Sequence, residues 1–314
     1  LSGGSETRPE VDRRAASRSS VVDGEITATV RVVRACITLL VVGALVAGAV
    51  RAATVSSSGE DAVVSGLSLT AVVLAGTLIL LGSLVEGFGF GLSLGTNWPY
   101  TRNILVLLVR GDPEAAHRIV ATLLGLLAVA LVILDPSSLT ISALALIVVT
   151  ALFGVGTLHV LAGRLPSVVH GIHGLLAYGV FLCFLCMQYL PGVDFWAYLE
   201  EMGNLHCVLL AVFMGGLTTG QRGFGQPIGA FDVPRRPSQW AVLVHIVTAL
   251  AVVGTLGWEM PTYKVAFYLA VTQVLVGFLL FHAVNLRPKA PGILVAFHQA
   301  MVIAITVAIV AVAS

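Results

Sequence analysis

The chain has 314 residues, of which 57% are hydrophobic and 11% charged, and its mean hydropathy is +0.98. This composition supplies too little polar surface to cover a soluble globule, and repeated long apolar runs are typical of transmembrane helices. The formal net charge of +1 says nothing about nucleic acid, but the sequence has no basic stripe with interleaved aromatic residues, so we expect no nucleic-acid partner.

The first 29 residues are polar and carry both charges, so the sequence predicts a disordered tail without the apolar run of a signal peptide. Nine apolar segments follow, each of about the 20 residues that a bilayer requires. They cover 30–54, 64–86, 113–134, 138–163, 167–190, 200–221, 238–258, 262–286 and 291–313. The predicted fold is therefore an all-α polytopic membrane protein whose first partner is the lipid bilayer.

The distribution of Lys and Arg predicts the orientation. Of the 17 Lys and Arg residues, all except Arg51 and Lys264 fall on the side that holds the N-terminus and the two long loops, 87–112 and 222–237. We therefore expect that side to face the cytoplasm of a prokaryotic plasma membrane, or the matrix of a mitochondrial inner membrane.

An internal repeat follows the first helix. Segment 64–86 leads into a glycine-rich loop and then a helix with His117-Arg118-Ile119-Val120-Ala121, and segment 200–221 leads into a similar loop and a helix with His245-Ile246-Val247-Thr248-Ala249. In each case a helix without an early histidine comes next, followed by a helix that has one. The repeat predicts a tail (1–29), an extra helix and loop (30–63), and two pseudo-symmetric four-helix units (64–190 and 191–314).

Four histidines occupy matching places in this repeat: His117, His173, His245 and His298. Each lies within about two turns of a helix start, and all four starts face the positively charged side. Helical bundles build cofactor sites from side chains on facing helices, and two neutral imidazoles form an axial pair for heme iron. We therefore predict one bis-histidine heme site per unit, with Arg118 and the loop residues Arg102, Arg110, Arg222, Arg235 and Arg236 beside the heme propionates.

Other interpretations of the histidines stay open. A single histidine near a helix end is more often a packed or interfacial residue than a ligand, and His170 competes with His173 from the same helical face. His159 and His282 close their helices on the positive side, whereas His206 belongs to the other side. Zinc is the rival metal, but its tetrahedral site needs more ligands than two histidines, and the second unit has no carboxylate that matches Glu114.

These motifs resemble the heme A synthase family of cytochrome oxidase assembly proteins, over about residues 64–313. The resemblance rests on Glu114-Ala-Ala-His117-Arg118, on Gly87-Phe-Gly-Phe-Gly-Leu-Ser with Trp98-Pro99, on the run from Val160 to Ala177 that contains His170 and His173, and on His245 and His298. It implies eight helices in two pseudo-twofold halves.

The resemblance also implies an activity. The C-terminal half would hold a permanent heme b, and the N-terminal half would hold heme O, oxidise its methyl group to a formyl group and yield heme A. Glu114 would be the catalytic carboxylate, acting in proton transfer or stabilising a cationic intermediate.

Two alternatives belong to other functional classes. The stretch from Leu94 to Asn103 lacks the cysteine pair that many family members carry, and the extra first helix places the histidines on the cytoplasmic side. Both observations favour a non-catalytic diheme b-type subunit, with a second heme b in the N-terminal half, that carries electrons or anchors a respiratory complex. A transporter or structural subunit with packed histidines is the third interpretation. Respiratory-complex or assembly-factor subunits, and a second copy of the chain, are the protein partners left open.

Overall fold

The computed structural model describes residues 8–54, 59–98, 103–223, 225–230 and 233–312. Within these ranges the secondary structure consists of helices and turns, with no strand, so the predicted all-α class is confirmed. The helices are α1 (Arg8–Thr54), α2 (Gly59–Gly87), α3 (Ile104–Arg110), α4 (Pro113–Leu134), α5 (Ser138–Leu161), α6 (Val168–Tyr189), α7 (Phe195–Glu201), α8 (Gly203–Arg222), α9 (Pro237–Trp258), α10 (Lys264–Leu286) and α11 (Leu294–Val312).

Nine helices in the described part of the chain are long and apolar enough to cross a membrane, and they match the nine predicted segments. The chain is therefore an integral membrane protein. The two remaining helices, α3 and α7, were not predicted. Both are seven residues long, and α7 is nucleated by Asp194, whose carboxylate accepts hydrogen bonds from the backbone N–H groups of Trp196 and Ala197 at 3.1 and 2.9 Å.

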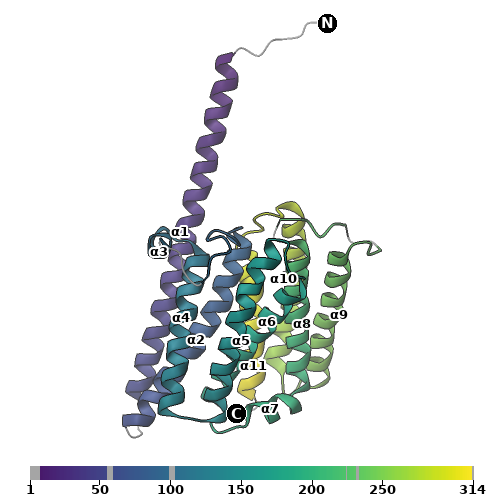
Figure 1. The fold of residues 1–314 in the computed structure, drawn as a ribbon. Helices are drawn as coiled ribbons and strands as arrows, with labels where there is room; N and C mark the ends of the chain where they lie inside the picture. Colours follow the sequence, from purple (N-terminus) through teal and green to yellow (C-terminus); the bar gives the residue numbers. More distant parts are fainter. Residues whose placement is uncertain (1–7, 55–58, 99–102, 224, 231–232, 313–314) are drawn as a thin grey trace.

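The start of α1 differs from the expectation of a disordered tail up to residue 29. The helix begins at Arg8 and runs without interruption into the apolar segment, and only residues 1–7 of the expected tail lie outside the described residues. After Pro9 the segment contains no proline, so no backbone N–H is missing from the helical ladder. In Figure 1 this polar extension leaves the bundle at the end where the loops before α4 and α9 lie.

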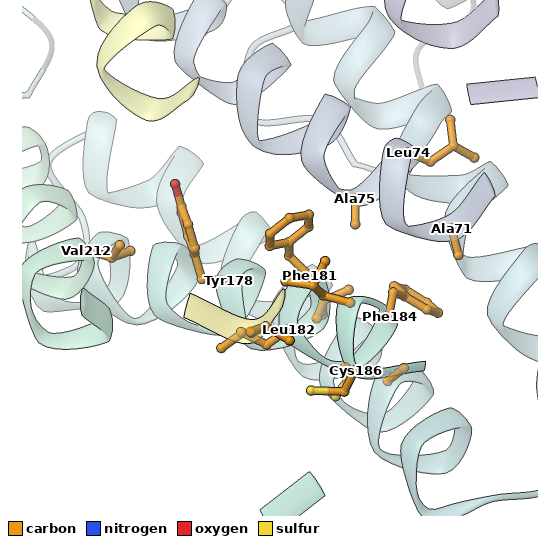
Figure 2. Packing of buried hydrophobic residues seen from close by; sticks show 14 of the residues in the cluster. Ala71, Leu74, Ala75, Tyr178, Phe181, Leu182, Phe184, Cys186 and Val212 are labelled. Carbon is orange, nitrogen blue, oxygen red and sulfur yellow. The ribbon is translucent and has the colours of Figure 1, made fainter. Parts of the chain in front are cut away.

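The bundle is organised around α6, which packs against α2, α5, α8 and α11. A run of its side chains from Tyr178 to Cys186 is almost fully buried, and Figure 2 shows Phe181 and Phe184 directed among Ala71, Leu74 and Ala75 of α2. Since aromatic side chains bury large areas, this helix holds the first four-helix unit (α2, α4, α5 and α6) against the second (α8 to α11). The cysteines of this stretch, Cys183 and Cys186, are free thiols.

A polar junction also joins the two units at the end of the bundle where α2 and α8 finish. Arg222 of α8 donates to Glu86 of α2 at 3.2 Å and to the main-chain oxygen of Pro288 at 3.0 Å, and its side chain is only 2% exposed. Nearby, the N–H of Gly292 donates to the oxygen of Gly87 at 2.7 Å, and a Cβ at Gly87 would collide with the backbone of Gly292. The glycine-rich motif after α2 thus allows two loops to meet.

The extra helix α1 packs on α2 through small residues. A Cβ added to Gly66 of α2 would lie 2.7 Å from the Cβ of Ala52 and 2.8 Å from the main-chain oxygen of Gly48, both on α1. Small residues of this kind allow two membrane helices to approach closely, and van der Waals contact is then the main source of their association.

A Gly66→Val substitution is therefore expected to push α1 away from the bundle and to cost about 1–3 kcal/mol, the usual range for overpacking. The measurement is the midpoint of thermal unfolding in detergent, together with cross-linking between α1 and α2. Gly43→Val is the matched control, because a Cβ at Gly43 of α1 meets nothing within 4 Å. Equal behaviour of the two variants would contradict this packing.

Candidate functional site

The four predicted histidines lie on α4, α6, α9 and α11, and each is anchored to the helix that precedes its own in the same unit. The Nδ1 atom lies near an oxygen of the main chain in three cases: His117 to Leu78 at 3.2 Å, His173 to Thr150 at 3.1 Å and His245 to Ala211 at 2.9 Å. A carbonyl oxygen only accepts hydrogen bonds, so these Nδ1 atoms carry the proton. The Nε2 lone pair of each ring then remains for a metal.

A glycine lies against the Cε1 atom of every one of these rings. A Cβ added at the glycine would lie 3.2–3.6 Å from that atom, in the pairs Gly82 with His117, Gly154 with His173, Gly215 with His245 and Gly277 with His298. Each glycine comes four residues after the residue that faces Nδ1 of the same ring. Both contacts with the ring therefore come from one turn of the neighbouring helix. The same local arrangement therefore occurs four times, twice in each unit.

The histidines are also brought together in pairs. The rings of His245 and His298 have centroids 6.2 Å apart and planes inclined by 59°. His117 and His173 of the first unit lie near enough to interact electrostatically. The second unit thus brings one histidine of its second long helix close to one of its fourth, and the ligand pairing in the first unit stays a prediction.

The spacing of the second pair fits an axial pair of heme ligands. With metal–nitrogen distances of about 2 Å, two imidazoles on opposite sides of one metal have ring centres about 6 Å apart. All four histidines are half-buried. Among the described residues, no three His, Cys, Asp or Glu side chains converge as a tetrahedral site requires. The donor set described for the second unit is therefore two imidazoles.

His170, the competitor of His173, faces a different helix. A Cβ added at Gly220 of α8 would lie 3.0 Å from the Cβ of His170, whereas a Cβ added at Gly154 of α5 would lie 3.2 Å from the ring of His173. His170 thus lies at the junction between the two units. His282 is exposed and lies edge-on against Phe278, with ring centroids 4.5 Å apart.

Glu114 and Arg118 organise the loop over the first histidine pair. Oε1 of Glu114 accepts from Arg118 at 2.6 Å, and Oε2 accepts from the hydroxyl of Ser93 at 2.9 Å and the backbone N–H of Leu94 at 3.1 Å. Arg118 also donates to the main-chain oxygen of Asn97. The carboxylate is 5% exposed and lies in the first turn of α4, where the helix dipole favours a negative charge.

The second unit has no counterpart of Glu114. Aligning His117 with His245 places Val242 where the first unit has Glu114, and Ile246 where it has Arg118. The repeated histidine anchors therefore carry a buried acid and its arginine partner only in the first unit.

Among the arginines assigned to propionates, Arg222 has a different role. Its guanidinium is held by Glu86, by Pro288 and by the main-chain oxygen of Gln226, at 3.0–3.2 Å, and it joins the two units. Arg102 lies outside the described residues. Arg118 lies at the mouth of α4 beside the first pair, and the propionate role there stays a prediction.

The glycines against the rings and the residues that face Nδ1 were not predicted from the sequence. The signal that could have found them is the spacing of four between Leu78 and Gly82, Thr150 and Gly154, Ala211 and Gly215, and Gln273 and Gly277, always on the helix before a histidine helix. The spacing has no meaning until the partner helix is known, because the contacts cross between helices.

No protein-family model, curated protein or solved structure matches this chain.

The glycines behind the rings give a direct prediction. Gly215→Val is expected to displace the His245 ring, because even a Cβ at this position lies 3.3 Å from Cε1, and thereby to remove the cofactor of the second unit. The measurement is the heme content of the purified protein. Gly254→Val on α9 is the control, since a Cβ there meets nothing within 4 Å. Full cofactor content in Gly215→Val would contradict the assignment.

Proposed function

We propose that this chain is a heme-binding integral membrane protein of the heme A synthase type. It would oxidise the methyl group of heme O in the first unit and hold a permanent heme b in the second. The observation that carries the proposal is the fourfold anchor: an imidazole with its Nδ1 side held by the neighbouring helix and a glycine against Cε1, occurring twice in each unit.

All four histidines lie in helices that are long and apolar enough to cross a membrane. Buried ionisable or polar side chains in a membrane interior are expensive and usually functional. A ring packed only for structure has no need of a matched spacing from a second ring, whereas His245 and His298 lie at the separation of an axial pair. Anchoring of Nδ1 is the arrangement that orients metal-binding histidines and raises their basicity.

The residues of the first unit supply the parts that such an oxidation needs. His117 and His173 would bind and orient the substrate heme. Glu114 is a buried acid one turn before His117 on α4, so it would be placed to exchange a proton near the reacting group. Arg118 pairs with this carboxylate at 2.6 Å and would lie beside the substrate's propionates.

The non-catalytic diheme subunit is the second candidate, and a specific observation favours it. Both oxygens of Glu114 are already engaged, with Arg118 and with the loop residues Ser93 and Leu94. A carboxylate used to hold a loop does not need to exchange protons. In this alternative both units hold heme b and the protein carries electrons or anchors a respiratory complex.

Cofactor analysis separates these candidates. A pyridine hemochrome spectrum of the purified protein, with mass analysis of the extracted cofactors, is expected to give heme b together with heme O or heme A. Two equivalents of heme b alone would support the electron-carrying subunit instead. Protein that contains no heme after expression with an ample heme supply would overturn both, and the histidines would then be packing residues.

A further inference from the structure

One of the four histidine anchors differs from the other three. The Nδ1 atom of His298 faces no main-chain oxygen; it lies 2.9 Å from the side-chain Nε2 of Gln273. Gln273 precedes Gly277 by four residues, so it occupies the position that Leu78, Thr150 and Ala211 hold in the other anchors. A side chain has replaced a backbone carbonyl as the partner of the ring.

The hydrogen bonds of this amide determine where the proton of His298 lies. The Gln273 Nε2 atom is also 2.9 Å from the main-chain oxygen of His298, and an amide NH₂ group has two hydrogens to donate. One goes to that oxygen, so the other goes to Nδ1, which must accept. A neutral imidazole that accepts at Nδ1 carries its proton at Nε2, the opposite of the other three rings.

The orientation of the Gln273 amide also leaves its oxygen without a hydrogen bond, which costs free energy. The Gln273 side chain is 9% exposed, and its Oε1 is buried without a hydrogen-bond partner. Leaving a buried acceptor unpaired costs free energy, so such a group needs a reason to persist. The oxygen is the atom that would accept the Nδ1 proton if the amide turned over.

We propose that Gln273 is a positioning residue that makes His298 a conditional ligand of the second unit's cofactor. This inference rests on the proposed heme-binding function. Coordination through Nε2 requires one proton to move from Nε2 to Nδ1, and the amide to rotate so that Oε1 accepts it. No proton is gained or lost overall. The rotation sacrifices the bond from Gln273 to the His298 main-chain oxygen, so His298 binds more weakly than His245, whose proton is already on Nδ1.

Two substitutions test the role of the amide. Gln273→Ala installs the residue found at position 211, removes the amide from Nδ1 and is expected to let the main-chain oxygen of residue 273 accept from Nδ1, as the Ala211 oxygen does from His245. Gln273→Glu places a carboxylate there, which only accepts. Both are expected to slow loss of the second unit's heme to excess apo-globin by about 10-fold or more, the scale of partners to metal-bound histidines. Gln273→Glu should also lower the midpoint potential, because it makes the imidazole more basic.

Thr150→Ala is the matched control in the first unit. The Thr150 hydroxyl bonds to Leu146 within its own helix, and the Thr150 main-chain oxygen is the atom that holds His173. This variant should therefore leave both hemes unchanged. Unaltered heme loss and unaltered potential in both Gln273 variants would overturn the proposal.

A measurement without heme keeps the inference separate from the proposed function. In the heme-free full chain labelled with ¹⁵N-histidine, His298 is expected to appear as the Nε2–H tautomer, and to become Nδ1–H in Gln273→Glu. His117, His173 and His245 should be Nδ1–H throughout. An Nδ1–H signal for His298 in the unsubstituted chain would refute the role of the amide, whatever the heme content. Absence of heme with the expected tautomers would refute the proposed function alone.

Discussion

Replacing His245 with alanine is expected to reduce the heme content of the purified protein from two equivalents to one. His245 supplies one of the two rings of the second unit, and its Nδ1 proton is fixed by Ala211. Without it, His298 alone faces the cofactor, and it is the ring whose Nε2 is protonated in the resting amide arrangement. The retained heme should be the one bound by the first unit. Quantitative hemochrome analysis and mass analysis of the extracted heme provide the measurement.

Two other histidines serve as controls for this experiment. His282→Ala removes a ring that lies against Phe278 on α10. His206→Ala removes a ring near the start of α8, at the end of that helix away from Arg222. Both variants should keep two hemes. A His245→Ala protein with full heme content would exclude the second pair as an axial pair, whereas loss of heme from all three variants would indicate a general defect in folding.

Substituting Glu114 with glutamine is expected to preserve both hemes and to lower the yield of heme A by about 10²- to 10⁴-fold, the usual contribution of a general acid or base. Glutamine retains an oxygen that can accept from Arg118, but it cannot exchange a proton. Its amide nitrogen would also face the N–H of Leu94, which now donates to the carboxylate at 3.1 Å. Conversion of heme O to heme A in membranes, measured by chromatography of extracted hemes, is the readout.

Ser93→Ala distinguishes two roles of Glu114, holding the loop and transferring a proton. It removes one hydrogen bond to Glu114, of 2.9 Å, but leaves the carboxylate and its partner Arg118 in place. Activity close to the unsubstituted level in Ser93→Ala, with loss in Glu114→Gln, supports proton transfer by the acid. Equal losses in the two variants would mean that Glu114 acts by holding the loop. Full activity in Glu114→Gln would remove it from the reaction.

The periodic features of the chain were predictable from its sequence. Nine apolar runs of sufficient length specify nine spanning helices, because a helix in a bilayer must satisfy its own backbone hydrogen bonds. The matched order of the four early histidines follows from the repeat, since each lies four to eight residues after the start of its helix. The helical extension back to Arg8 was not predicted, because charged and polar residues are compatible with both a helix and a disordered tail.

What only the tertiary structure decided are the contacts that cross between helices. That His170 faces α8 while His173 faces α5, and that Arg222 joins the two units through Glu86, depends on how the helices are rotated against one another. The same is true of Gln273, which in the sequence is one polar residue in an apolar helix. Helix length and depth are local properties written in composition and spacing, whereas the partner of a given side chain is set by packing, which no single segment contains.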